Sequence, residues 1–191
     1  MRIDKLDDPD AELVRRAGGG DSAACAALVD RHLNRLLALA VRMLGNRADA
    51  EDVAQETFLR VWQRAASWRA GDAQFSTWLY RVALNLCHDR LRQRRPQVDV
   101  DIVDLAANDE SGEHESQRGA VAAAVAGALM GLPERQREAI VLCYYQELGN
   151  IEAARVLDVS VEALESLLSR ARRTLRETLR SRAEDLIGEV P

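Results

Sequence analysis

Apolar and polar residues alternate with a helical period along most of this chain. Between residues 49 and 65, Ala50, Ala54, Phe58, Val61 and Ala65 recur every three or four positions. That spacing places all five on one face of an α-helix, the face that a helix buries. The sequence has no sustained period-two alternation, which would indicate strands, and only four prolines. The pattern therefore predicts an all-α fold.

Residues that favour helix ends divide this pattern into discrete segments. Asp21 and Ser22 are typical N-cap residues for the second segment, and Gly45 with Asn46 would end it. Proline favours the first turn of a helix, and Pro133 holds such a position. The predicted helices cover residues 10–17, 22–44, 49–66, 75–94, 117–130, 133–148, 150–157 and 160–179.

A change in composition after the fourth helix predicts two domains. Residues 98–116 hold seven acidic side chains and no lysine or arginine, and their apolar content is too low to form a core alone. We expect one small helical domain over residues 1–95, an acidic flexible linker over 96–116, and a second small helical domain over 117–191. A short helix within the linker, packed against either domain, is the alternative.

The last two predicted helices have the spacing of a helix-turn-helix. A short helix over 150–157 and a longer one over 160–179 are separated by a turn of about three residues. Asp158 stands where the turn needs a left-handed residue, which aspartate tolerates better than most. Many helical hairpins bind no DNA, but the arginines that follow favour a DNA-binding function, because they can contact phosphates.

The net charge of −5 conceals two basic regions. Residues 75–95 carry five arginines and one aspartate, a net charge of +4, and residues 160–183 carry six arginines and three glutamates, a net charge of +3. These two regions leave −12 for the rest of the chain. Because the distribution of charge matters more than its sum, a nucleic-acid partner is compatible with an acidic protein.

The reactive residue types form no recognised catalytic or metal-binding motif. The three cysteines and three histidines are scattered, without the spacing of zinc ligands, and there is no glycine-rich phosphate loop. Asp52 and Glu56 share a helix face but lack the Glu-x-x-His partner of a di-metal bundle. We therefore expect no catalytic residue, no cofactor, no metal and no small-molecule substrate.

The sequence also predicts where the protein works. No signal peptide is recognisable, and the apolar runs, such as residues 36–41, are far too short to cross a bilayer. The cysteines are scattered and odd in number, so we interpret them as small apolar side chains rather than disulfide partners. Unpaired cysteines are typical of a reducing compartment. We expect a cytoplasmic protein with no membrane partner.

The outward face of the helix over 49–66 combines polar groups with one leucine. A solvated acidic face would explain the acids and amides of this face, but it gives no reason for Leu59 among them. The outward residues are Asp49, Asp52, Gln55, Glu56 and Leu59, and the pattern raises the question of why a leucine lies among acids and amides.

The helix over 75–94 carries a second candidate surface. Leu79, Val82 and Leu86 recur at helical spacing and are interpreted as core. Trp78 is equally compatible with the core and with stacking on an unpaired base, because it lies among arginines that could bind the backbone. Asn85 offers both a donor and an acceptor, and is therefore a candidate base reader.

Three stretches together resemble the extracytoplasmic-function sigma factors, small two-domain specificity subunits of bacterial RNA polymerase. The stretches are DAEDVAQETFLRVWQ, FSTWLYRVALNLCHDRLRQRR, and GLPERQREAIVLCYYQEL followed by EAARVLDVSVEALESLLSRARRTL. They occur in the family's order and cover most of the chain. The resemblance implies an alternative sigma factor that directs promoter recognition, melting and transcription initiation, whereas the polymerase supplies the chemistry.

The resemblance also implies partners for the two surfaces. The outward face with Asp49, Asp52, Gln55, Glu56 and Leu59 would bind the clamp helices of the largest polymerase subunit. The loop over 69–74 and the following helix would read the melted minus-ten element, and the linker would thread the polymerase channel. The implied minus-ten residues are Asp72, Phe75, Trp78, Arg81, Asn85, Arg90, Arg92, Arg94 and Arg95.

The helix-turn-helix would read the minus-thirty-five element as duplex, and an anti-sigma factor is a further expected partner. The implied DNA contacts are Ser160, Glu162, Glu165, Ser166, Ser169, Arg170, Arg172 and Arg173. Glu165 and Leu167 depart from the basic residues common in the family's recognition helix, although a glutamate can accept from a cytosine amine.

Two other functions are compatible with parts of the sequence. A sigma-like module could sequester an anti-sigma factor without binding DNA, but it would have no need of the arginines at 90–95. A helix-turn-helix repressor would leave residues 1–95 without a role.

Overall fold

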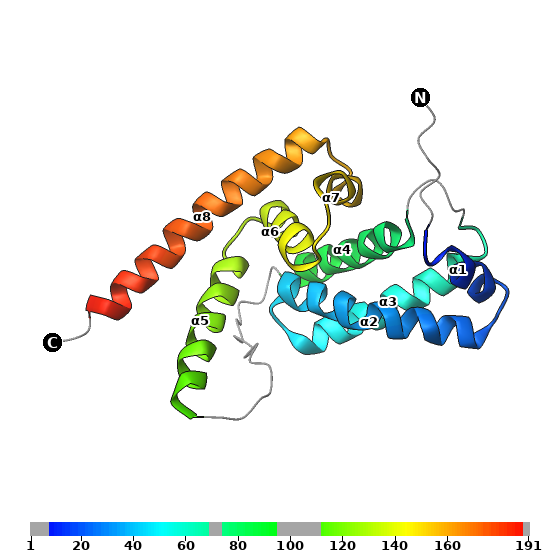
Figure 1. The fold of residues 1–191 in the computed structure, drawn as a ribbon, viewed down its shortest axis with the longest axis horizontal. Helices are drawn as coiled ribbons and strands as arrows, with labels where there is room; N and C mark the ends of the chain where they lie inside the picture. The colour runs from blue at the N-terminus through cyan, green and yellow to red at the C-terminus, as the bar shows by residue number, and fades with distance from the viewer. Residues whose placement is uncertain (1–7, 69–73, 95–111, 189–191) are drawn as a thin grey trace.

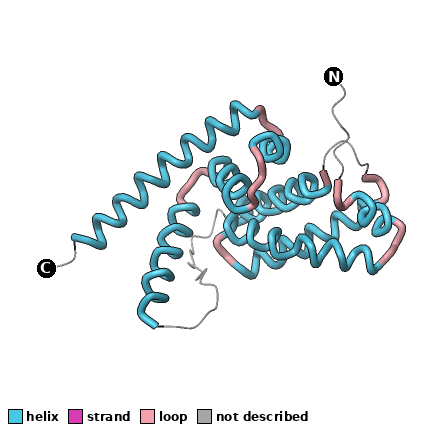
Figure 2. Tube along the Cα trace, in the orientation of Figure 1, coloured by secondary structure: helices cyan, strands magenta, loops and turns pink. Residues whose placement is uncertain are grey.

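The computed structural model describes residues 8–68, 74–94 and 112–188, with the side chains of the last range described from 119 to 181. Within these ranges the regular structure is helical (Figure 2), so the predicted all-α fold is confirmed. The helices are α1 (Ala11–Gly18), α2 (Ser22–Leu44), α3 (Arg47–Ala65), α4 (Phe75–Arg94), α5 (Gly112–Met130), α6 (Glu134–Ile140), the π-helical turn η1 (Val141–Tyr145), α7 (Asn150–Leu157) and α8 (Val161–Gly188).

Several predicted helix ends are made by the residues that the sequence indicates, but Pro133 precedes α6 as its N-cap and Asn46 caps α3. The Asp21 carboxylate accepts hydrogen bonds from the backbone N–H groups of the first turn of α2, and Gly45 ends that helix with a φ of 66°. Asp158 has a φ of 55° in the turn between α7 and α8, and the Ser160 hydroxyl accepts from the N–H of Ala163. The helix-turn-helix is therefore present.

The N-terminal half, α1–α4, is a four-helix unit with an apolar centre. The stripe predicted from the opening pattern is buried in it: Ala50, Ala54, Phe58, Val61 and Ala65 all lie in the core. Helix α3 packs against both α2 and α4, and α1 lies across α2 and α3. This packing leaves the opposite face of α3 exposed.

The C-terminal half, α5–α8, contains the helix-turn-helix. Helix α8 packs against α5, α6 and α7 and extends beyond them toward the C-terminus (Figure 1). Three of its core side chains are Leu164, Leu168 and Ala171. The two halves are also in contact, because α4 packs against α7, and α2 packs against α5, α6 and η1.

Three predicted boundaries differ from the structure by three residues or more. Helix α5 begins at Gly112, so residues 112–116 of the expected linker are helical, while residues 96–111 lie outside the described residues. The segment predicted as one helix over 133–148 ends as a π-helical turn at Tyr145, and Glu147 then takes a φ of 57°. Helix α8 continues to Gly188, because its periodic pattern persists past the expected end.

Candidate functional site

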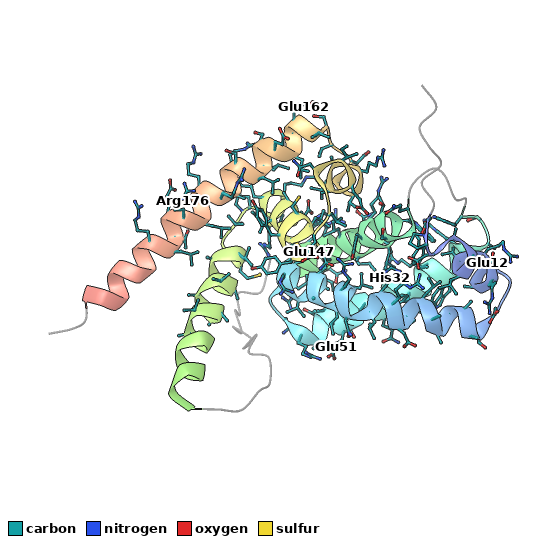
Figure 3. The ribbon with its side chains drawn as sticks, viewed as in Figure 1. Glu12, His32, Glu51, Glu147, Glu162 and Arg176 are labelled. Carbon is teal, nitrogen blue, oxygen red and sulfur yellow. The ribbon has the colours of Figure 1, made fainter. Side chains whose placement is uncertain are left out.

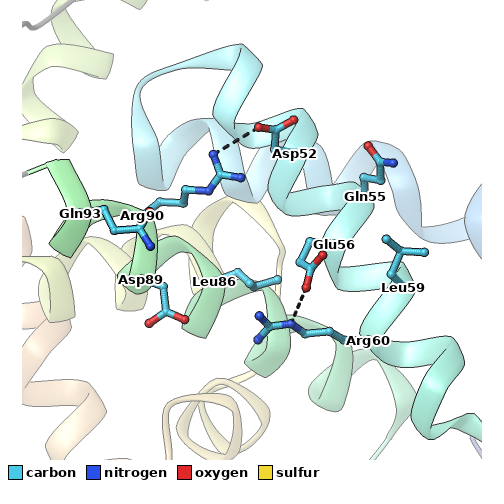
Figure 4. A pocket seen from close by; sticks show the side chains of 9 residues that line it. All are labelled: Asp52, Gln55, Glu56, Leu59, Arg60, Leu86, Asp89, Arg90 and Gln93. Carbon is cyan, nitrogen blue, oxygen red and sulfur yellow. Dashed lines mark hydrogen bonds and ion pairs between the residues drawn. The ribbon is translucent and has the colours of Figure 1, made fainter.

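The outward face of α3 forms one wall of a groove, and α4 forms the other. The groove has a volume of about 490 Å³ and is shown in Figure 4. Leu59 is 47% exposed at its edge, and Leu86 of α4 lines it. Its lining residues are Asp52, Gln55, Glu56, Leu59, Arg60, Leu86, Asp89, Arg90 and Gln93. The structure therefore brings together four of the five residues predicted for the protein-binding face.

Asp49, the fifth predicted residue, lies beside the groove and anchors arginines from α4. Arg90 Nη1 lies 3.1 Å from Asp49 Oδ1 and 3.2 Å from Asp52 Oδ2, and Arg94 pairs with Asp49 as well. The Arg94 guanidinium also donates to the carbonyl of Leu44, 3.1 Å away. These ion pairs link the end of α4 to the start of α3 and partly neutralise the acids.

The ion pairs along this groove are accessible to solvent. The Asp52 side chain is 59% exposed and that of Arg90 is 35% exposed, and Arg60 Nε donates to Glu56 Oε1 at 2.9 Å on the same surface. Exposed pairs of this kind contribute only about 0–1 kcal/mol each. A charged partner could therefore replace them at little cost, which suits a docking surface.

A separate face of α4 gathers the candidate base readers. Trp78, Arg81, Asn85 and Arg92 recur at spacings of three, four and seven, and so share one side of the helix. Arg81, Asn85 and Arg92 are exposed, and Trp78 is half-buried. Arg90 and Arg94 turn to the other side, toward α3. The predicted minus-ten arginines are thus divided between two faces.

Phe75, predicted as a minus-ten contact, is not accessible to nucleic acid in this structure. Phe75 is completely buried, with its ring centroid 5.4 Å from that of His32 and 6.4 Å from that of Trp68. Trp78 packs edge-on against it at 6.0 Å. No face of the Phe75 ring is open to a base, because the residue fills the centre of this aromatic cluster. Asp72 and Arg95, also predicted as minus-ten contacts, lie outside the described residues.

The backbone N–H of Phe75 donates a hydrogen bond to a residue far away in the sequence. Asp8 Oδ2 accepts from this N–H at 2.5 Å and caps the start of α4, while Asp8 Oδ1 accepts from the N–H of Asp10 at 2.8 Å. Asp10 in turn lies 2.7 Å from the His32 imidazole. Sequence reasoning missed this pair of acids, because nothing local to them indicates a contact with α4.

The predicted DNA-contacting residues of α8 are all exposed. Glu162, Ser166, Ser169 and Arg173 form one stripe on the side opposite the buried Leu164. Ser160, Glu165, Arg170 and Arg172 lie next to that stripe. Figure 3 shows Glu162 near the start of α8, with Arg176 farther along the same helix.

Local interactions hold several of these side chains. Hydrogen bonds from its own backbone N–H and from Ser160 lower the pKa of Glu162, which keeps this carboxylate charged at the positive end of the helix. Glu165 Oε1 accepts from Asn150 Nδ2 at 3.3 Å, a contact between the two helices of the motif. Leu167 is partly buried against the core, so it serves packing in addition to any external contact.

Polar residues buried in α6 and next to η1 are the other feature that sequence reasoning missed. Arg137, Glu138 and Gln146 are almost completely buried. Burial raises the cost of a charge unless it is paired, and here desolvation lowers the pKa of Arg137. The only signal in the sequence is a charged pair placed directly before the apolar run 139–143.

Metal-ligand clusters and membrane-spanning helices are both absent from the described residues. Among the residues that the structure describes, no group of histidine, cysteine and acidic side chains could hold a metal ion. In the same ranges, no helix combines the length and apolarity that a membrane crossing needs.

Comparison with protein-family models gives two matches that coincide with the two halves. Residues 28–97 match the family described as Sigma-70 region 2, and residues 122–175 match Sigma-70, region 4. The first match includes the groove and the exposed face of α4, and the second includes the helix-turn-helix.

Individual relatives align along most of the chain. The ECF RNA polymerase sigma factor SigW of Bacillus subtilis is 32% identical over 178 residues, covering 87% of this chain and 95% of the relative. The RNA polymerase sigma-H factor of Pseudomonas aeruginosa is 34% identical over 182 residues, covering 89% and 93%.

Solved structures share the fold. CnrH, in a complex with the cytosolic domain of CnrY, superposes with a TM-score of 0.69 at 31% identity, covering 91% of this chain and 99% of that one. The sigma factor RpoE of Bartonella quintana, in a complex with the anti-sigma factor NepR, gives a TM-score of 0.66 at 24% identity, covering 81% and 96%.

Proposed function

The chain belongs to the extracytoplasmic-function sigma factors of the sigma-70 family, and we propose that its α3–α4 groove is the surface that binds core RNA polymerase. As an alternative sigma factor it binds the core enzyme and promoter DNA, and it directs transcription initiation. Sigma factors are non-enzymatic initiation factors, and we propose that this chain likewise has no catalytic residue and needs no cofactor. Binding to the core enzyme would place it in the cytoplasm.

One observation carries the assignment of the groove: an exposed leucine lies among acids whose ion pairs are solvent-accessible. Leu59 supplies apolar area at the groove edge, and Asp52 and Glu56 supply negative charge that is only partly neutralised. A basic helical partner would bury the leucine and take over the acids from Arg90 and Arg60. The clamp helices of the largest polymerase subunit are the partner that the family implies.

Charge reversal in this groove gives the test. Asp52→Arg is expected to weaken binding to core polymerase at least tenfold, because it repels a basic partner and also Arg90, which lies 3.2 Å from Asp52. The exposed position should keep the change in the free energy of unfolding near 0.5 kcal/mol. Titration of labelled chain with core polymerase and thermal unfolding of the free chain measure the two quantities.

Glu51→Arg is the matched control for this substitution. Glu51 is the preceding residue of α3, is exposed, and pairs with Arg47 at 2.9 Å outside the groove. It reverses the same charge on the same helix, so it should leave core binding within about twofold of the native chain. Equal losses for the two variants would show a general charge effect and would remove the groove as the docking site.

We propose that the two domains bind different promoter elements. Residues 1–95 would form the domain that binds the core enzyme and the minus-ten element, 96–116 the linker, and 117–191 the domain that binds the minus-thirty-five element. The minus-ten face would comprise Trp78, Arg81, Asn85 and Arg92, which lie on one side of α4. Arg90 and Arg94 would bind the DNA backbone only after leaving Asp49, the acid that they contact in the free chain.

In the helix-turn-helix, different residues would contact the DNA phosphates and recognise the bases. The exposed Arg173 lies on the outer stripe of α8 and is suited to phosphate contact, whereas Glu165 lies at the edge of the stripe near the start of the helix. Arg173→Ala should weaken holoenzyme binding to all promoters alike and lower the salt dependence by about one unit. Glu165→Lys should change minus-thirty-five preference if Glu165 reads a base.

A panel of single-base promoter variants distinguishes these outcomes. Binding is measured at several salt concentrations for holoenzymes made with each variant. A base-specific loss for Arg173→Ala would contradict its assignment to phosphate. Uniform tightening by Glu165→Lys across the panel would identify Glu165 as a solvated group without a reading role.

An anti-sigma factor is the further partner that we propose. CnrH is solved with the cytosolic domain of CnrY, and it covers 91% of this chain at 31% identity. This similarity supports regulation of the present chain by a protein that masks its functional faces. A module that only sequesters such a protein would need no base-reading face, and the exposed Asn85 and Arg81 of α4 favour the complete sigma factor.

A further inference from the structure

Two buried acids before α1 connect the N-terminal segment to the start of α4. Asp8 Oδ2 accepts from the backbone N–H of Phe75, the first residue of α4, at 2.5 Å. Asp8 Oδ1 accepts from the N–H of Asp10 at 2.8 Å. A carboxylate at this end of a helix also interacts favourably with the helix dipole. The first turn of α4 is therefore capped by a side chain 67 positions earlier in the sequence.

Asp10 fixes the position of this segment against α2. Its Oδ2 lies 2.7 Å from His32 Nε2, and its Oδ1 pairs with Arg31. Arg31 also donates to the carbonyl of Pro9 at 3.3 Å. Burial raises the pKa of Asp10, but the hydrogen bonds and charges of His32 and Arg31 outweigh burial, so this pKa lies below its ordinary value. Asp10 is thus held charged, and it keeps Asp8 within reach of α4.

The His32 imidazole, which binds Asp10, also contacts the aromatic cluster at the start of α4. Its ring centroid lies 5.4 Å from that of Phe75 in an edge-on arrangement, and Phe75 is completely buried. Trp78 packs edge-on against Phe75 as well, at 6.0 Å. Aromatic pairs favour such geometries over a face-to-face sandwich. Both the backbone and the ring of Phe75 are therefore linked to the two acids, and the ring supports Trp78.

Trp78 is the member of the proposed minus-ten face that depends most on this arrangement. It lies about one turn beyond Phe75, whereas Asn85 lies about two turns farther along α4. A shift of the first turn would therefore displace the indole before it affected the rest of the face. Trp78 is half-buried, so its indole is both supported by the protein and partly accessible to a ligand. Such a ring is suited to stacking on an unpaired base.

We propose that Asp8 and Asp10 are positioning residues that hold Trp78 where it stacks on an unpaired minus-ten base. They act through the Phe75 N–H and the His32 ring. This role rests on the proposed function of the α4 face and extends it to residues that touch no DNA, because both acids are buried. A ring that is already held in its binding orientation loses less entropy on binding. The two acids therefore raise the affinity for the melted strand.

A double-mutant cycle in the holoenzyme tests whether the acids act through Trp78. Asp8→Ala removes both acceptor oxygens, and it is made in the native chain and in Trp78→Ala. Asp21→Ala is the matched control, because Asp21 caps α2 instead of α4, with hydrogen bonds of 2.9 and 3.2 Å. The probe is a single-stranded oligonucleotide that carries the minus-ten element of a promoter transcribed by the native holoenzyme. Titration with core polymerase reports assembly, and thermal unfolding of each free chain reports folding.

Stacking on one aromatic ring contributes roughly 5- to 150-fold to the binding of a base. Trp78→Ala and Asp8→Ala should therefore each lower the affinity of the holoenzyme for the oligonucleotide about tenfold. In the Trp78→Ala chain, adding Asp8→Ala should change this affinity by no more than about twofold, because the ring that Asp8 positions is gone. Asp21→Ala should stay within about twofold of its parent chain, although loss of a cap lowers its Tm as well. Core binding should be unchanged in every variant.

Two further substitutions separate positioning from folding. Asp8→Asn keeps one acceptor oxygen for the Phe75 N–H and should bind the oligonucleotide within about threefold of the native holoenzyme. His32→Gln keeps a donor for Asp10 but removes the ring from Phe75, so it should weaken oligonucleotide binding in the native chain and have no effect in Trp78→Ala. It also serves as the test if Asp8→Ala fails to fold.

Equal losses from Asp8→Ala in the native and Trp78→Ala chains would overturn the inference, since the acids would then act independently of the ring. Equal losses from Asp8→Ala and Asp21→Ala would overturn it too, because they would show only the effect of a weaker helix cap. Failure of the proposed function gives a different result, in which Trp78→Ala binds the oligonucleotide as tightly as the native holoenzyme. In that case the indole is no part of the minus-ten face, and the positioning role falls with it.

Discussion

Replacing Arg137 by alanine is expected to lower the free energy of unfolding by about 3 kcal/mol. The buried guanidinium donates to the carbonyls of Met43 at 2.6 Å, Met130 at 3.1 Å and Leu132 at 3.2 Å. Each carbonyl left without a donor costs about 1–3 kcal/mol, although removing a buried charge recovers part of this loss. Urea unfolding measures the effect as a lower midpoint with an unchanged slope.

Arg155→Ala is the control for this prediction. Arg155 lies on α7 of the same half and is exposed, so its loss should change stability by no more than about 0.5 kcal/mol. Arg137→Lys should recover part of the loss, since an ammonium can bind some of the carbonyls but lacks the fork of donors. If Arg137→Ala is no more destabilising than Arg155→Ala, the three carbonyl contacts contribute nothing to stability.

Asn85→Ala is expected to relax base preference at one minus-ten position in the holoenzyme. The Asn85 amide can donate and accept together, and a good amide–base pair contributes about 1–3 kcal/mol of discrimination, or roughly 5- to 150-fold. Asn85 is exposed on the same side of α4 as Arg81 and Arg92, so its removal should leave the fold intact. Transcription from single-base variants of the minus-ten element measures the change.

Asn34→Ala provides the comparison, because Asn34 is an exposed asparagine on α2, away from the α4 face. It should leave the profile across all minus-ten variants unchanged. A uniform loss for Asn85→Ala at every position would mean that Asn85 supports binding in general and reads no base.

The helices and their ends could be predicted because the determinants are local. The stripe from Ala50 to Ala65 and the left-handed residues Gly45 and Asp158 need no information about the rest of the fold. The exposed face of α3 also follows from its period, since the buried stripe fixes which side chains point outward.

The arrangement of charges could not be predicted, because it depends on which helices meet. Arg90 and Arg94 looked like free DNA contacts in sequence, but the packing of α4 against α3 places Asp49 within reach of both. Phe75 stands near arginines in the sequence, yet the rings of His32, Trp68 and Trp78 enclose it. The burial of Glu138 could not be predicted either, because its partner His88 lies 50 residues away in the sequence.

The most direct test of the central claim is promoter-specific transcription by purified core polymerase supplemented with this chain. On a library of genomic promoter fragments, the native chain should yield discrete transcripts that core polymerase alone does not make, with strand opening at the minus-ten element. Asp52→Arg should lower these transcripts together with core binding, while Glu51→Arg should not. A chain that binds core polymerase or an anti-sigma factor, yet yields no specific transcript from the library, would contradict its assignment as an initiating sigma factor.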